Sequence, residues 1–245
     1  MFAKVIIIAA GLFGLGGFLM ALIHRIHKTP LTARISDWVK YGVYLVIVGG
    51  MLSACYAGRW ATIAVIAGVI AVAGFELHKN FRKKKISKSL LTLAVMLIVI
   101  CLAHLFLAPG GSWQNSFAFL FLLVAVNDSY SQLWGRLVGR RKLLIRVSPG
   151  KTVEGAIGGT LSTVGAVFLL AFLLTGVAMF VLISIGVLVS FSATVGDLCF
   201  SHVKRNLGIK DFSGLLPGHG GILDRFDSLI FAAPVFYWSG RLLIA

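Results

Sequence analysis

The chain has 245 residues, of which 58% are hydrophobic and only 13% charged, and its mean hydropathy is +0.95. A soluble domain normally carries about 25% charged residues. One compact core could not hide this much apolar surface from water, so we exclude an ordinary soluble fold and expect lipid as the main solvent. The net charge of +15 lies in short loops without a basic, aromatic-lined groove, and we therefore expect no nucleic-acid partner.

Apolar runs long enough to cross a bilayer, about 20 residues at the helical rise, follow one another along the whole chain. The predicted membrane helices cover residues 3–23, 39–57, 59–77, 88–107, 112–130, 153–174, 176–198 and 227–244. Little more than Gly58 and Arg59 separates the second from the third, which predicts a tight helical hairpin. We predict an all-α, polytopic membrane protein with about eight spans and a single transmembrane domain over residues 1–245.

The basic residues alternate along the chain between rich and poor loops. Nearly all of the 23 Lys and Arg residues lie in the loops 24–40, 78–88, 131–152 and 199–226, whereas the intervening connections carry only Arg59. Because Lys and Arg are retained on the cytoplasmic side of a membrane, these four loops are predicted to face the cytoplasm and both termini the outside. The expected location is the cell (plasma or inner) membrane.

Several of the eight carboxylates lie where the predicted spans meet the cytoplasmic loops. Asp128 closes the fifth span, Glu154 opens the sixth, Asp197 closes the seventh and Asp227 opens the eighth. Acids at a membrane helix cost free energy unless they have partners or a function. Each could pair with a nearby base for structure alone, but four at one depth favour a metal site. Carboxylates without clustered Cys or His suit a hard cation such as Mg²⁺.

Basic residues surround these acids in the last cytoplasmic loop. They are Lys204, Arg205, Lys210 and Arg225, more bases than the acids nearby would neutralise. A metal ion together with surplus cations is typical of a site for a polyphosphate.

The stretch from residue 148 to 155 is the first candidate phosphate-binding loop. Ser148 is a good helix N-cap and Pro149 suits the first helical position, so the sixth helix is predicted to begin here. Its free N–H groups and Lys151 would then face an anion. An ordinary helix start with a snorkelling lysine is the alternative. We reject a Walker loop because Ile145 stands where that pattern needs glycine.

The stretch from residue 201 to 227 is the second. Gly220 and Gly221 permit backbone conformations that other residues forbid. His219 beside them could contact a phosphate or a pyrimidine, or relay a proton, although a lone histidine is more often structural. Asp224 and Asp227 share one face if the eighth helix begins here.

At these residues the sequence resembles the phosphatidate cytidylyltransferases (CDP-diacylglycerol synthases). Their signature runs Ser-x-apolar-Lys-Arg, four residues, Lys-Asp, then a small residue, Pro, His-Gly-Gly and Asp-Arg-x-Asp. The matching positions here are Ser201, Val203, Lys204, Arg205, Lys210, Asp211, Ser213, Leu216, Pro217, His219, Gly220, Gly221, Ile222, Asp224, Arg225, Phe226 and Asp227. With a second block between residues 128 and 155, the family-like, catalytic part covers about residues 127–237. Residues 1–126 are expected to be lipid-facing scaffold, and in them only Glu76 shows a weak likeness to the family.

The resemblance implies that CTP and phosphatidate react, with Mg²⁺ present, to CDP-diacylglycerol and pyrophosphate for phospholipid synthesis. It implies a metal centre held by Asp197 and Asp224, with Lys204 and Arg205 completing the catalytic set. The implied substrate- and phosphate-binding residues are Ser148, Lys151, Ser201, Lys210, His219, Gly220, Gly221 and Arg225. The supporting acids are Asp128, Glu154, Asp211 and Asp227.

Some alternatives stay open at this point. Family members often have Ala-Tyr where this chain has Ser131-Gln132, which puts one substrate contact in question. A CTP-dependent polyprenol kinase and a non-enzymatic anion or lipid transporter are the rival functions, although a transporter would be expected to show repeats or midplane charges. A CDP-alcohol phosphatidyltransferase would need an aspartate pattern that is absent. Membrane lipids are expected partners, and a second cation and a homodimer stay open.

Overall fold

The computed structural model describes residues 2–84, 88–107, 112–216 and 220–244. Its elements, in chain order, are α1 (Phe2–Ile26), α2 (Leu31–Ala57), α3 (Arg59–Lys83), α4 (Lys88–Ala103), η1 (His104–Phe106), α5 (Trp113–Val138), β1 (Lys142–Leu144), β2 (Ser148–Thr152), α6 (Val153–Leu170), η2 (Ala171–Leu173), α7 (Met179–Asn206) and α8 (Leu223–Ile244). Every apolar run singled out in the sequence is helical, so the all-α prediction is confirmed apart from one short hairpin.

Five of the described helices are long and apolar enough to cross a membrane: α1, α2, α3, α6 together with η2, and α7. The described part of α4 and η1 is a shorter apolar helix. In α5 and α8 the apolar run is interrupted by polar residues such as Asn127, Asp128 and Asp227. These two helices carry Asp128, Asp224 and Asp227, and they lie among the other helices of the bundle.

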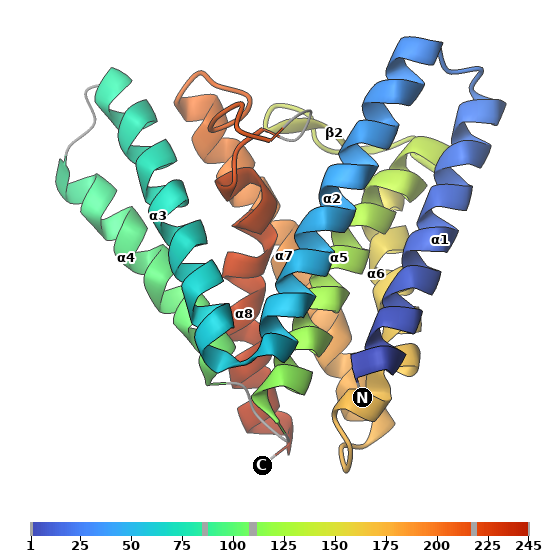
Figure 1. Ribbon diagram of the computed structural model, residues 1–245. Coiled ribbons are helices and arrows are strands. Elements are labelled where there is room, and N and C mark those ends of the chain that lie inside the picture. Colours follow the sequence, from blue (N-terminus) through green and yellow to red (C-terminus); the bar gives the residue numbers. More distant parts are fainter. Residues whose placement is uncertain (1, 85–87, 108–111, 217–219, 245) are drawn as a thin grey trace.

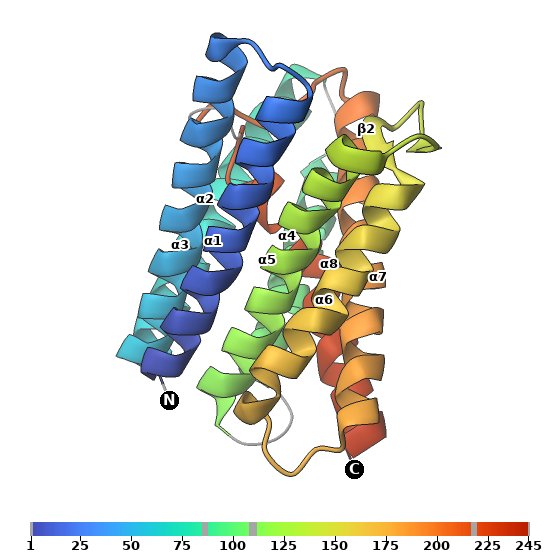
Figure 2. The same cartoon turned by 90° about the vertical axis from the view of Figure 1, so that its right-hand side faces the viewer.

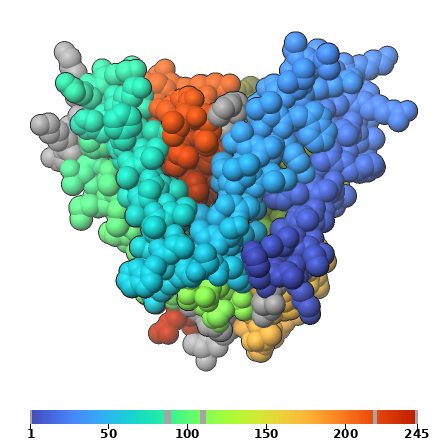
Figure 3. All heavy atoms as spheres, viewed as in Figure 1, coloured from blue at the N-terminus to red at the C-terminus, as the bar shows by residue number. Residues whose placement is uncertain are grey.

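The helices run roughly along one axis, and both ends of the chain lie at the same end of the bundle (Figure 1). Both termini are at the lower end of the bundle, while the β1–β2 hairpin and the loop between α7 and α8 are at the upper end, here called the loop face. Figure 2 shows α5 and α6 side by side, with α7 and α8 beyond them. Towards the loop face α1–α2 and α3–α4 diverge, and the surface of the α7–α8 region is visible in the notch between α2 and α3 (Figure 3).

Helix α5 is the centre of the bundle. Every residue from Ser116 to Asn127 is buried, because α1, α2, α6, α7 and α8 all contact this helix. A helix that is apolar on all sides lies either in a protein core or in lipid, and these contacts place α5 in the core. The polar residues at the end of α5 are thereby carried into the middle of the loop-face end.

The segment before α6 differs from the prediction. Ser148 does not cap a helix; residues 148–152 form β2, which pairs antiparallel with β1 through Leu144↔Ser148 and Lys142↔Thr152. Helix α6 begins at Val153, and its N-cap is Thr152, whose Oγ1 accepts the N–H of Gly155 at 3.1 Å. The hairpin pairing satisfies the backbone groups of this segment, an interaction that local capping rules do not include.

A close contact between α5 and α6 depends on glycine. A Cβ at Gly159 would lie 1.9 Å from Ser131 Oγ and 3.0 Å from the carbonyl oxygen of Asn127, and one at Gly155 would lie 2.7 Å from the carbonyl oxygen of Ser131. Glycines four residues apart let membrane helices approach each other closely. This contact positions α5, and so Asp128, relative to the hairpin.

We therefore expect Gly159→Val to separate α5 from α6 and to lower the free energy of unfolding by about 1–3 kcal/mol, the usual cost of overpacking. The matched control is Gly165→Val on the same helix, where a Cβ would meet nothing within 4 Å. Thermal unfolding in detergent compares the two variants. Equal midpoints would contradict the role given to this contact.

Candidate active site

Acidic and basic side chains from three elements meet near the loop face. Asp197 on α7 has Oδ2 2.5 Å from Lys151 Nζ on β2, and its Oδ1 accepts the hydroxyl of Ser201 at 3.2 Å. The side chains of Lys151 and Asp197 are 25% and 30% exposed. Two residues implied by the family resemblance, 46 positions apart in the chain, thus form a charge pair that a ligand can reach.

Asp224 has a different environment. Its side chain is fully buried; Oδ1 accepts from Lys204 Nζ at 2.7 Å, and Oδ2 accepts the backbone N–H groups of Phe212 and Gly221 at 2.9 and 2.8 Å. Lys204 Nζ is also 4.0 Å from Asp227. The expectation that Lys204 is a surplus cation without a carboxylate partner is therefore wrong. Through these contacts Asp224 connects the loop between α7 and α8 to both helices.

The glycine turn in this loop is fitted around the same carboxylate. Gly220 has φ +79°, a conformation that favours glycine, and a Cβ there would lie 2.8 Å from Asp224 Oδ2. His219, proposed from the sequence as a phosphate or base contact, lies outside the described residues, as do Pro217 and Gly218. The backbone conformation at position 220 and the nearby carboxylate of Asp224 therefore explain why this residue is glycine.

Glu76 reaches the loop from the N-terminal half. This side chain of α3 is buried, and its carboxylate accepts the hydroxyl of Ser213 at 2.6 Å and the N–H groups of Ile222 and Leu223 at 3.0 Å each. A carboxylate at these N–H groups caps α8 favourably. The sequence showed only an echo of the family at Glu76. A single acid inside an apolar run was the available signal, because such acids need partners.

Asp128, Asp197 and Asp227 are near enough to repel one another electrostatically. No three His, Cys, Asp or Glu side chains among the residues the structure describes are close enough to bind a metal ion together. Mg²⁺ usually takes one or two carboxylates and completes its shell with water and substrate phosphates. Asp197 and the half-buried Asp128 suit that requirement, so the donor set fits a hydrated Mg²⁺ ion. Both oxygens of Asp224 and of Asp197 have donors, but the side chain of Asp197 is partly exposed, whereas that of Asp224 is fully buried.

The other residues implied by the resemblance have mainly structural contacts. Arg205 donates to the carbonyl oxygens of Val147 and Ile209 at 3.1 and 3.3 Å. Glu154 accepts the N–H of Arg140 at 2.9 Å and thereby holds the start of the hairpin. Three further residues implied by the resemblance lie at the loop-face end. Ser148 is part of β2, and the side chains of Lys210 and Asp211 are exposed.

Replacing Lys204 tests whether the buried pair stabilises the loop. Lys204→Met should lower the free energy of unfolding by about 3–5 kcal/mol, because it leaves Asp224 and Asp227 buried without their cation. Lys210→Met removes an exposed lysine from the same loop and should stay within about 0.5 kcal/mol. Chemical denaturation in detergent measures both. A Lys204→Met protein as stable as the Lys210→Met protein would contradict the structural role.

Comparison with known proteins places this arrangement in a family. The chain is 41% identical over 149 residues to the uncharacterized protein YnbB of Escherichia coli, which is 58% of this chain and 50% of that protein. It is 42% identical over 118 residues to a phosphatidate cytidylyltransferase of Staphylococcus saprophyticus, 48% of this chain and 45% of that protein. A phosphatidate cytidylyltransferase of Staphylococcus haemolyticus is 33% identical over 184 residues, 73% and 70% of the two chains.

The chain spans about half the length of the first two of these relatives. Residues 114–243, from α5 to α8, match the cytidylyltransferase family. This segment contains the acids and bases described above except Glu76. This match covers more than half of the chain, and the Staphylococcus haemolyticus protein is matched over more than two thirds of its length. The chain therefore belongs to the cytidylyltransferase family.

Proposed function

We propose that the protein transfers the cytidylyl group of CTP to phosphatidate and forms CDP-diacylglycerol and pyrophosphate. The observation that carries this proposal is the partly exposed Lys151–Asp197 pair, which lies beside Asp128 and Asp227 at the polar end of an apolar helix bundle. A lipid phosphate and a water-soluble nucleotide can meet only at such an interface. The names of the Staphylococcus relatives support the same reaction.

The chemistry requires two anions to react. A phosphate oxygen of phosphatidate attacks the α-phosphorus of CTP, a new P–O bond forms, the bond to the β-phosphate oxygen breaks, and pyrophosphate leaves. Because the attacking phosphate is already ionised, no strong general base is needed. Charge neutralisation and in-line positioning are therefore the main contributions of the protein, and Lys151 and Arg225 are the bases placed to supply them.

Asp197 would hold the Mg²⁺ ion, which when bound neutralises phosphate charge. The second ligand depends on the loop between α7 and α8. Asp128 can serve as the structure stands, whereas Asp224 can serve only if Lys204 moves away from it. In either case Glu76 keeps the start of α8 in place.

We also infer the orientation of the protein. All eight helices cross the cell membrane, the loop face with its Lys- and Arg-rich loops lies in the cytoplasm, and both termini lie outside. This follows from the positive-inside rule and agrees with the two termini lying at one end of the bundle (Figure 1).

The reaction is tested with purified protein, Mg²⁺, phosphatidate and CTP labelled at the α- or the γ-phosphate. The α-label should appear in the lipid and the γ-label in pyrophosphate. A lipid kinase would instead transfer the γ-label, and a transporter would transfer neither. Asp197→Asn should lower turnover at least about 100-fold, or ~2.7 kcal/mol of barrier, with the folded fraction unchanged on size-exclusion chromatography. Near-normal turnover by Asp197→Asn would make that acid merely structural.

Cysteine labelling tests the orientation. In a protein whose Cys55, Cys101 and Cys199 are replaced by alanine, single cysteines at positions 84, 140 and 210 should react with an impermeant maleimide only from the cytoplasmic side. A cysteine at position 175, in the connection between η2 and α7 at the opposite end, should react only from outside. External labelling at any of the first three positions overturns the orientation.

A further inference from the structure

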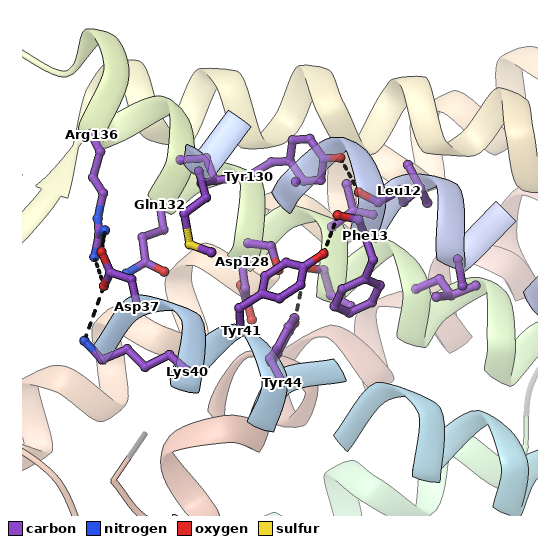
Figure 4. Close-up of a pocket in the computed structure, with 18 of the residues that line it drawn as sticks. Leu12, Phe13, Asp37, Lys40, Tyr41, Tyr44, Asp128, Tyr130, Gln132 and Arg136 are labelled. Atoms are coloured by element: carbon purple, nitrogen blue, oxygen red, sulfur yellow. Dashed lines mark hydrogen bonds and ion pairs between the residues drawn. The ribbon is translucent and has the colours of Figure 1, made fainter. Parts of the chain in front are cut away.

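A cavity lies between α1, α2 and α5, next to the candidate active site (Figure 4). Its volume is about 140 Å³ and it opens to the outside, so it can hold part of a long ligand but does not enclose a whole one. Two of its three walls, α1 and α2, belong to the N-terminal half that the sequence indicated only as scaffold. The proposed reaction uses two residues of its lining, Asp128 and Arg225, but gives the rest of the cavity no role.

The lining changes character along the length of the cavity. One end is apolar, with Leu12 and Phe13 among its walls (Figure 4). Asp128 lies further along, and Asp37 and Arg136 lie at the opposite end, nearer the loop face (Figure 4). An occupant that fits such a lining has a long apolar part and a charged group.

The carboxylate at the loop-face end already has its partners within the protein. Arg136 makes two hydrogen bonds to Asp37, at 2.6 and 3.2 Å, and Lys40 and His24 lie 3.7 and 3.0 Å from the same carboxylate. These contacts tie α1, α2 and α5 together and so form the wall of the cavity. Because Arg136 is already paired with Asp37, it is less suited than an unpaired arginine to bind a ligand anion.

Arg225 is placed differently. It comes from the first turn of α8 and lines the same cavity. Its Nε is buried and has no hydrogen-bond partner among the described residues, and no ion pair to its guanidinium is found in that part of the chain. A buried donor without an acceptor is destabilising, because it has lost its hydrogen bonds to water. A guanidinium matches the geometry of a phosphate group, so an incoming phosphate would satisfy it.

We propose that this cavity is the binding site of the lipid substrate, with an acyl chain between α1, α2 and α5 and the lipid phosphate at Arg225 beside Asp128. The proposal rests on the proposed function and names the part of the molecule that takes the lipid. Lys151 and Asp197 are then left for the nucleotide side of the reaction. The N-terminal helices, which lie largely outside the family match, become a substrate-binding wall.

The cavity offers a matched pair of glycines on α1. Gly16 is buried and lines the cavity, and a Cβ there would meet only Leu133, at 3.9 Å; Gly14 is exposed and a Cβ there would meet nothing within 4 Å. Gly16→Leu should raise the KM for long-chain phosphatidate at least tenfold and leave the KM for CTP within twofold. Gly14→Leu should change neither. Unfolding midpoints close to that of the unchanged protein show that both variants are folded.

A binding experiment separates this proposal from the proposed reaction. Phosphatidate carrying a photoreactive group on its acyl chain, added without CTP, should label α1, α2 and α5, and Gly16→Leu should abolish that labelling. Unlabelled phosphatidate should compete much better than diacylglycerol, and Arg225→Gln should remove this preference. If the protein proves inactive with CTP, the labelling still decides whether the cavity binds the lipid.

Three outcomes would overturn the inference. Labelling confined to other helices would place the lipid elsewhere. Labelling that persists in Gly16→Leu would show that the acyl chain does not enter the cavity. Equal competition by phosphatidylglycerol would show that the cavity binds bulk anionic lipid, not the phosphomonoester that the reaction needs.

Discussion

The loop between α7 and α8 depends on one buried carboxylate. Asp224 accepts the ammonium of Lys204 and the N–H groups of Phe212 and Gly221. Two charged groups can be buried in a membrane protein only when they are paired and their remaining hydrogen bonds are made. Both conditions are met here, and as a result α7, α8 and the loop between them are held in one arrangement.

Glu76 extends this arrangement to the N-terminal half. Its carboxylate binds the N–H groups of Ile222 and Leu223 and so fixes where α8 starts. Arg225 and Asp227 follow within the first turns of α8 and are positioned by it. Both buried acids therefore serve geometry, whereas the partly exposed Asp197 is left to meet a ligand. This arrangement leaves Asp197, the proposed metal ligand, accessible, while Asp224 and Glu76 hold the loop nearby.

The position of the site follows from the boundary between lipid and water. The apolar surface of the helices requires lipid, whereas CTP is soluble in water, so the two proposed substrates could meet only near the loop face. The proposed lipid cavity between α1, α2 and α5 reaches Asp128 and Arg225 from the bundle, and the Lys151–Asp197 pair faces outward from the hairpin side. The proposed division, with lipid on one side of α5 and nucleotide on the other, needs no large movement of the helices.

The helices could be predicted from the sequence because lipid imposes a length and an apolar composition on each span. The acids at the ends of α5, α7 and α8 could be found for the same reason, since polar residues near a membrane are costly. Contacts between distant segments could not be predicted. Pairing across the hairpin displaced the expected cap at Ser148, and only the folded chain brought Lys204 to Asp224 and Glu76 to the start of α8. These pairings depend on positions far apart in the chain, so tertiary packing alone decided which acids are buried supports and which remain open to a ligand.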